Sequence, residues 1–106
     1  MRNYSAKANM YRLPHERMKE LRAFCLSACG DDFELIRDIA DDTAGGTMPR
    51  WIVLSVTSTQ WPWSRCEAYG IPCTRQTFRI YRMRFYWLLD RNLKQAGHKT
   101  DPPGET

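Results

Sequence analysis

The chain has 106 residues, 42% of them hydrophobic, which indicates one small globular domain and excludes a wholly disordered chain. No stretch is long and apolar enough to cross a membrane, and the basic, polar start "MRNYSAKANMYRLP" lacks the apolar region of a secretory signal. We therefore expect a cytoplasmic protein whose four Cys are free thiols. The formal net charge of +4 is uneven, because residues 1–48 carry seven basic and eight acidic side chains whereas residues 49–106 carry nine and four.

The first twelve residues show no hydrophobic periodicity, so residues 1–12 are predicted to form a flexible arm before a single helical domain over residues 13–96. A first helix is expected to begin at Pro14, because proline suits the first helical position. Gly30 would end this helix. Its apolar face has helical spacing and consists of Met18, Leu21, Cys25 and Ala28.

A second helix is predicted over the segment "DDFELIRDIADDTA", residues 31–44. Asp31 or Asp32 would cap its start, where a carboxylate also suits the helix dipole. The glycine pair at 45 and 46 would end it. The side chains expected to be buried on this helix are Phe33, Ile36, Ile39 and Ala40.

The segment "MPRWIVLSVTS" is ambiguous, since its β-branched run could form either a helix or a strand. We favour a short third helix, because a lone strand would have no partner for its backbone hydrogen bonds. A fourth short helix is expected over residues 62–68, after the turn "TQWP".

The last helix is predicted to run from Thr74, a natural N-cap, to about Gln95, followed by a disordered tail over residues 97–106. The fold class is therefore all-α, with about five helices: an N-terminal helical hairpin and a C-terminal unit with a long last helix. At 100° per residue, one face of that helix is apolar and should be core. It carries Phe78, Tyr81, Phe85, Leu88 and Leu89.

Residues 62–95 resemble a helix-turn-helix unit, because a short helix, the turn "GIPC" and a Thr-capped helix follow one another. Such a unit places the start of its second helix in the major groove of DNA, where Arg pairs with guanine and Gln with adenine. No acidic residue precedes Asp90 in the last helix, and Arg75, Arg79, Arg82 and Tyr86 form one stripe beside the core face. The predicted DNA-binding residues are Thr74, Arg75, Gln76, Thr77, Arg79 and Arg82.

The stretch "WPWSRCEAYGIPCTRQTFRIYRMRFYWLL" resembles the C-terminal region of small phage and prophage transcriptional regulators of the ArpU/RinA type, with the similarity covering about residues 57–92. Those regulators are similar in turn to the promoter-reading region of sigma factors. The shared pattern is a Trp, a short helix, a Gly turn, a Ser/Thr-Arg pair and a basic-hydrophobic helix. The resemblance implies that Arg75, Gln76 and Arg79 face DNA, inside a host cell.

A third face of the last helix is also apolar and holds Ile80, Met83 and Trp87. A helix that is apolar on two sides usually lies between two layers or across a subunit interface. Either the first helix or a second copy of the chain could cover this face. We favour a homodimer, which would also suit a regulator that reads paired half-sites.

Other chemistry has little support in the sequence. The cysteines lack the spacing of a zinc site, and Cys25 and Cys29 extend an apolar stripe. His15 and His98 have no nucleophile or acid beside them in a catalytic pattern, and Gly45–Gly46 lacks the Lys of a phosphate-binding loop. We therefore expect no enzyme activity, no metal and no cofactor.

The leading hypothesis is a DNA-binding regulator of phage or prophage origin that contacts duplex DNA through its basic last helix. The alternative is a small phage protein that binds and inhibits a host or anti-phage protein, such as a nucleic-acid-binding enzyme, through an Arg and aromatic surface. Exposed arginines on a ridge would favour DNA, whereas exposed Met83 and Trp87 would favour a protein partner.

Overall fold

The computed structural model describes residues 10–100, with side chains described as far as Gln95. Between His15 and Thr100 it contains five α-helices and no strand, which confirms the all-α prediction. The helices are α2 (His15–Ser27), α3 (Asp31–Thr43), α4 (Met48–Thr57), α5 (Trp63–Ala68) and α6 (Arg75–Thr100).

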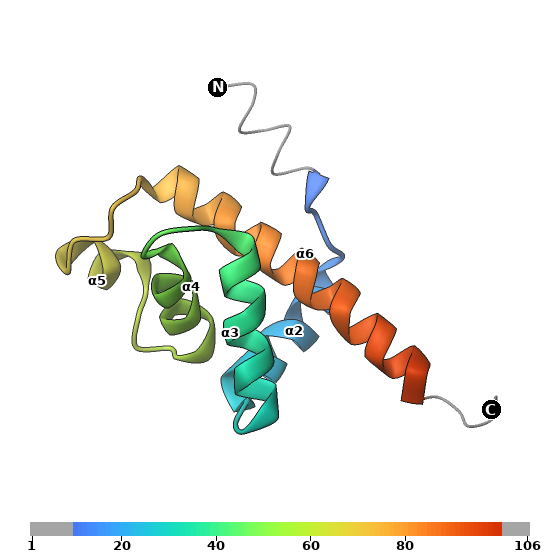
Figure 1. The fold of residues 1–106 in the computed structure, drawn as a ribbon. Coiled ribbons are helices and arrows are strands. Elements are labelled where there is room, and N and C mark those ends of the chain that lie inside the picture. The colour runs from blue at the N-terminus through green and yellow to red at the C-terminus, as the bar shows by residue number, and fades with distance from the viewer. Residues whose placement is uncertain (1–9, 101–106) are drawn as a thin grey trace.

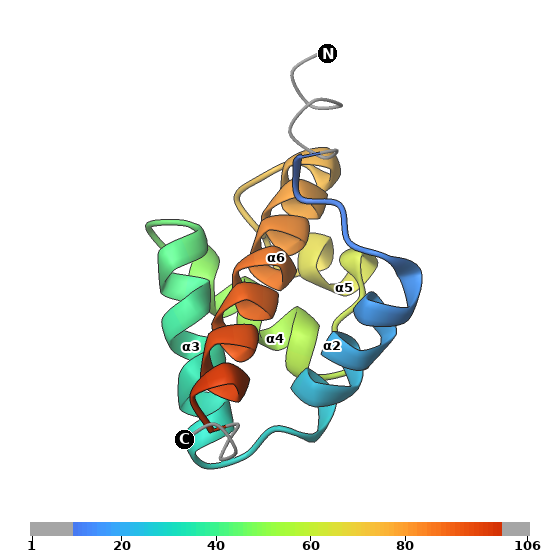
Figure 2. The same ribbon diagram turned by 90° about the vertical axis from the view of Figure 1, so that its right-hand side faces the viewer.

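Helix α6 crosses the whole molecule, and the other helices are arranged around it (Figure 1). It packs against α2, α3 and α4, and α4 packs against both α2 and α3. When α6 faces the viewer, α3 lies on one side of it and α2 on the other (Figure 2). The largest fully buried side chains are Phe85, Leu21, Ile36, Ile52, Leu89, Val56, Cys25 and Cys66.

The ambiguous β-branched segment is the helix α4, as predicted. Met48, Ile52 and Val56 are spaced by four residues and are all buried, so helical geometry places them on one face against the core. The Thr57 hydroxyl donates to the carbonyl of Val53 at 2.6 Å, so this polar group is satisfied within the helix. Burial of one helical face outweighs the modest helical cost of β-branched side chains.

The connection between α2 and α3 differs from the prediction. Helix α2 ends at Ser27, before Gly30, and Gly30 with φ of 60° is instead the residue that precedes α3. Asp31 therefore lies inside the first turn of α3 rather than capping it, and no side chain caps that helix. The carboxylates of this turn still face the positive end of the helix dipole.

The turn between α5 and α6 is longer than the expected "GIPC", because α5 ends at Ala68 and α6 begins at Arg75. Helix α5 closes with a Schellman motif: the Ile71 amide donates to Cys66 at 3.1 Å and the Gly70 amide to Glu67 at 3.1 Å. Gly70 has φ of 87°, which favours glycine, and the buried Ile71 seals the motif. Pro72 and Cys73 then form a bend before Thr74.

Thr74 caps α6 as predicted, since its hydroxyl oxygen accepts a hydrogen bond from the Thr77 amide at 3.2 Å. On the expected core face, Phe78, Phe85 and Leu89 are buried, and the other two side chains are half-buried. Helix α6 continues to Thr100, so residues 97–100 of the predicted tail are helical. Residues 101–106 of that tail and residues 1–9 of the predicted arm lie outside the described residues.

Asp90 is the one buried carboxylate among the described side chains, with 3% of its surface exposed. Its two oxygens pair with different cations: Arg17 from α2 at 2.5 Å and Lys94 from the next turn of α6 at 3.3 Å. Arg17 also reaches Glu20 at 2.7 Å. These contacts fix the first turns of α2 against the C-terminal half of α6.

Within the part of the chain that the structure describes, no helix is apolar over a length that could span a membrane.

Candidate nucleic-acid interface

The predicted DNA-binding residues lie at the free end of α6. The side chains of Thr74, Arg75, Gln76 and Arg79 are exposed, and that of Thr77 is half-buried beside its cap. This end of α6 projects beyond the α2–α3–α4 body in Figure 1. The start of a long helix also offers unpaired backbone amides and the positive end of the helix dipole, which suit a phosphate.

The predicted stripe turns inward at its C-terminal end. Arg82 is half-buried and Tyr86, which was expected beside the core, is 3% exposed. The Arg82 guanidinium lies 5.9 Å from the centre of the Tyr86 ring. Burial raises the pKa of Tyr86, and the nearby charges of Arg82 and Arg22 act in the opposite direction. Arg82 therefore lines a hollow between α2 and α6 rather than the exposed ridge.

That hollow, called here the basic groove, has a volume of about 560 Å³. The N-terminal segment, α2, the start of α5 and α6 all contribute to its walls. Its cationic lining consists of Arg12, Arg22, Arg75, Arg79 and Arg82. Its aromatic lining consists of Tyr11, Trp63, Phe78 and Tyr86.

Among the described residues, no carboxylate lines the basic groove and none forms an ion pair with its five arginines. The Arg82 Nε is buried and has no hydrogen-bond acceptor among the described groups. Acidic side chains gather instead on α3, on the far side of α6 from α2 (Figure 2). These acidic residues are Asp31, Asp32, Glu34, Asp38, Asp41 and Asp42.

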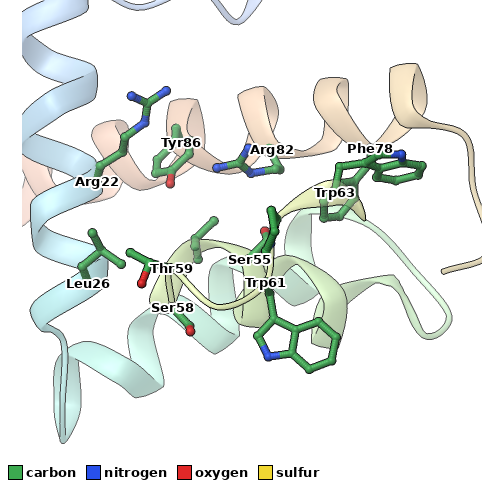
Figure 3. Close-up of a pocket in the computed structure, with 12 residues that line it drawn as sticks. Arg22, Leu26, Ser55, Ser58, Thr59, Trp61, Trp63, Phe78, Arg82 and Tyr86 are labelled. Atoms are coloured by element: carbon green, nitrogen blue, oxygen red, sulfur yellow. The ribbon is translucent and has the colours of Figure 1, made fainter. Parts of the chain in front are cut away.

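A second hollow of about 250 Å³ continues the basic groove toward the loop after α4. In Figure 3, Arg82 and Tyr86 lie along α6, Arg22 extends from α2 beside Tyr86, and Ser58 and Thr59 lie on the opposite wall. Both hollows share the side chains of Arg22, Pro62, Trp63, Phe78, Arg82 and Tyr86. The two hollows therefore adjoin each other at these six side chains, and together they are lined by arginine, aromatic and hydroxyl groups.

Sequence reasoning missed the contributions of Arg12, Arg22, Tyr11 and Trp63 to this groove. For Arg22 a signal existed, since it follows Met18 by four residues and so lies on the same side of α2 as the apolar stripe. The other three lie in or beside irregular segments. Their side chains meet α6 only through the path of the loops, which hydrophobic periodicity does not encode.

The apolar face predicted as a partner or dimer interface is half-buried at Ile80, Met83 and Trp87. The ring of Tyr11 contacts that of Trp87 edge-on, with ring centres 5.5 Å apart, and the Arg91 guanidinium lies 4.8 Å from the Trp87 ring centre. Met83 lines the basic groove. The chain itself thus supplies part of the cover that the sequence argument assigned to a second copy.

The four cysteines do not come together. Cys25 and Cys66 are buried, Cys29 is exposed and Cys73 is half-buried, and all four are free thiols. Burial raises the pKa of Cys25 to about 12. Among the described residues, no three His, Cys, Asp or Glu side chains are grouped closely enough to hold a metal ion.

Comparison with protein-family models, curated proteins and solved structures found no match for this chain. The features that indicate a function are the exposed arginines at the start of α6 and the arginine and aromatic lining of the basic groove.

Proposed function

We propose that this chain binds duplex DNA through the exposed first turns of α6. The observation that carries the proposal is the pair Arg75 and Arg79, which are exposed four residues apart beside Gln76 and have no carboxylate partner among the described residues. Arg and Gln can read guanine and adenine in the major groove. The resemblance to ArpU/RinA-type phage regulators supports transcription control as the role of such binding.

The distribution of charge supports the same proposal. The acidic helix α3 and the arginine-rich groove lie on opposite sides of α6, so one face of the molecule attracts a polyanion and the other repels it. Met83 and Trp87, which would favour a protein partner if exposed, are half-buried. The charge distribution suits any polyanion, and the half-burial of Met83 and Trp87 favours DNA over a protein as the partner of α6.

The direct test is a binding titration with labelled duplex DNA at several salt concentrations. If three phosphates are neutralised, affinity should fall roughly 40-fold between about 50 and about 200 mM salt, because each contact releases counterions. Arg79→Ala should weaken binding by about 1–3 kcal/mol. Arg84→Ala is the matched control, since Arg84 is exposed on α6 but lies outside the groove. Absence of duplex binding at low salt would refute the proposal.

One observation favours the alternative of a protein partner. The Arg65 guanidinium lies 4.5 Å from the ring centre of Trp61 and 5.6 Å from that of Tyr69, and Tyr69 is 64% exposed. An exposed Arg between aromatic rings is typical of interface hot spots. If this surface binds a protein, a nuclease-treated host lysate should yield a partner that the wild type captures and Tyr69→Ala does not.

A further inference from the structure

We propose that the basic groove is a binding site for single-stranded nucleic acid, with a backbone phosphate between Arg22 and Arg82 and a base against Trp63. The inference rests on the proposed nucleic-acid binding and adds to it a second site. That site is distinct from the exposed ridge of Arg75, Gln76 and Arg79, although Arg75 and Arg79 also form one wall of the groove.

The charges that line the groove favour an anion. Arg22 from α2 and Arg82 from α6 line the same hollow, and both charges act on Tyr86, which lies between these helices in the core. The Arg82 Nε–H is buried without an acceptor among the described groups, which is costly for a charged donor. Phosphate oxygens accept such donors and match the planar guanidinium in a bidentate geometry.

The size of the groove admits an unpaired nucleotide and excludes a duplex. A volume of about 560 Å³ is within the range of roughly 300–1,000 Å³ that is usual for clefts binding small ligands. Duplex DNA is much too wide to enter it, whereas the nucleotides of an unpaired strand are not. The adjoining second hollow is lined by Ser58 and Thr59, whose hydroxyls can bond phosphates or base edges.

The aromatic lining supports base stacking. The Trp63 ring packs against Phe78 with ring centres 5.8 Å apart, so its position is fixed, and the side chain remains half-buried at the groove wall. Tyr11 lines the groove together with it. A positively charged groove with aromatic rings is the arrangement by which proteins hold single strands with little sequence preference, since every base has a π-face.

The test compares two probes, a labelled single strand of about 12 nucleotides and a duplex of the same sequence. Arg22→Ala should weaken single-strand binding about tenfold, because it removes one charge-assisted phosphate contact, and should leave duplex binding within about twofold. Arg22 is exposed, so the variant should fold, and Arg84→Ala is the matched control on α6. Trp63→Phe keeps a ring against Phe78 and should weaken the single-strand complex selectively.

The outcomes separate the two proposals. Duplex binding without single-strand binding, or an equal effect of Arg22→Ala and Arg84→Ala on the single strand, would overturn the groove site and leave the duplex proposal standing. Single-strand binding that depends on Arg22, without duplex binding, would support the groove site and refute duplex binding by the exposed start of α6. Full competition by inorganic phosphate at the concentration of the oligonucleotide would show that the groove binds only an anion. It would therefore refute the proposal that the groove binds a nucleic-acid strand. Binding of neither probe would overturn both.

Discussion

The Arg17 guanidinium on α2 lies 2.5 Å from the Asp90 carboxylate on α6, and this contact joins residues 73 positions apart in the sequence. The hydrogen bond to Asp90 is the main cause of a raised pKa at Arg17. Asp90 has only 5% of its side chain exposed, so its charge depends on Arg17 and Lys94 for compensation. The pair locks the start of α2 to α6, next to the segment that carries Tyr11 and Arg12 into the basic groove.

Asp90→Ala should lower the free energy of unfolding by about 2–4 kcal/mol, because it leaves Arg17 without its buried partner while Glu20 still compensates part of the charge. Urea denaturation followed by circular dichroism would measure the loss. Glu34→Ala is the control: Glu34 and Arg37 are both exposed and 3.8 Å apart, so the change should be about 0.5 kcal/mol or less. Equal losses in the two variants would contradict a stabilising role for the Arg17–Asp90 pair.

Gly70→Ala should destabilise the protein by about 1–2 kcal/mol, because residue 70 has φ of 87° and a Cβ there is strained even though no atom lies within 4 Å of it. Gly45→Ala is a matched comparison, since Gly45 has equally open surroundings but no positive φ. That change should be neutral or slightly stabilising, because it reduces the freedom of the unfolded chain. Thermal melts would measure the stability of both variants. An unchanged melting temperature for Gly70→Ala would mean that stability does not depend on a glycine in the Schellman turn.

The thiols should differ in reactivity. Cys29 is exposed and should react quickly with a thiol reagent at pH 8. Cys25 should react only when the protein unfolds, because it is buried and its raised pKa of about 12 leaves almost no thiolate at that pH. Cys29→Ser should remove the fast phase and keep the slow one. Rapid labelling of Cys25 in the native protein would show that the core around α2 opens easily.

The same pKa predicts how stability changes in alkali. Folded Cys25 keeps its proton up to a pH of about 12, whereas the unfolded thiol loses its proton near its ordinary pKa of 9.0. The contribution of this group is therefore fully present below pH 9 and is lost as the pH rises toward 12. The unfolding free energy of the wild type should fall between pH 8 and 10 more steeply than that of Cys25→Ala. Parallel curves for the two proteins would contradict this linkage.

Tyr11 is predicted to control self-association through Trp87. Because the Tyr11 ring and Arg91 both contact Trp87 and cover part of it, we expect the wild type to sediment as a monomer. Tyr11→Ala should expose the face of Ile80, Met83 and Trp87 and increase association, whereas Arg84→Ala should not. A wild-type dimer that Trp87→Glu dissociates without unfolding would instead support the homodimer expected from the sequence.

Local sequence patterns predicted the helices well, because the formation of each helix depends on residues that are close in sequence. The spacing of Met48, Ile52 and Val56 identified α4, and Thr74 identified the start of α6. The inward turn of Arg82 and Tyr86 could not be predicted in this way, since it depends on how far α2 lies from α6. The end of α2 was misplaced for a related reason: Gly30 marks where the chain can reverse, but not which helix uses the reversal.

The basic groove could be predicted from the sequence only in part. The acid-free start of the last helix indicated Arg75 and Arg79, which do lie at its rim. The opposite wall comes from Tyr11, Arg12 and Arg22, and their approach to α6 is set by long-range contacts such as Arg17 with Asp90. Contacts between residues so distant in sequence leave no periodic signal. This wall of the groove could therefore not be predicted without the three-dimensional arrangement of the helices.

The placement of acidic α3 opposite the arginine-lined groove gives the molecule a permanent electric moment directed across α6. In the field of a polyanion this moment exerts a torque, so a molecule that diffuses toward a nucleic acid is rotated before the surfaces touch, over distances comparable to the Debye length of about 8 Å at physiological salt. A smaller share of encounters then occurs with the acidic α3 face toward the nucleic acid. For the nucleic-acid binding proposed above, the carboxylates of α3 should therefore increase the rate of association, although they are remote from every proposed contact.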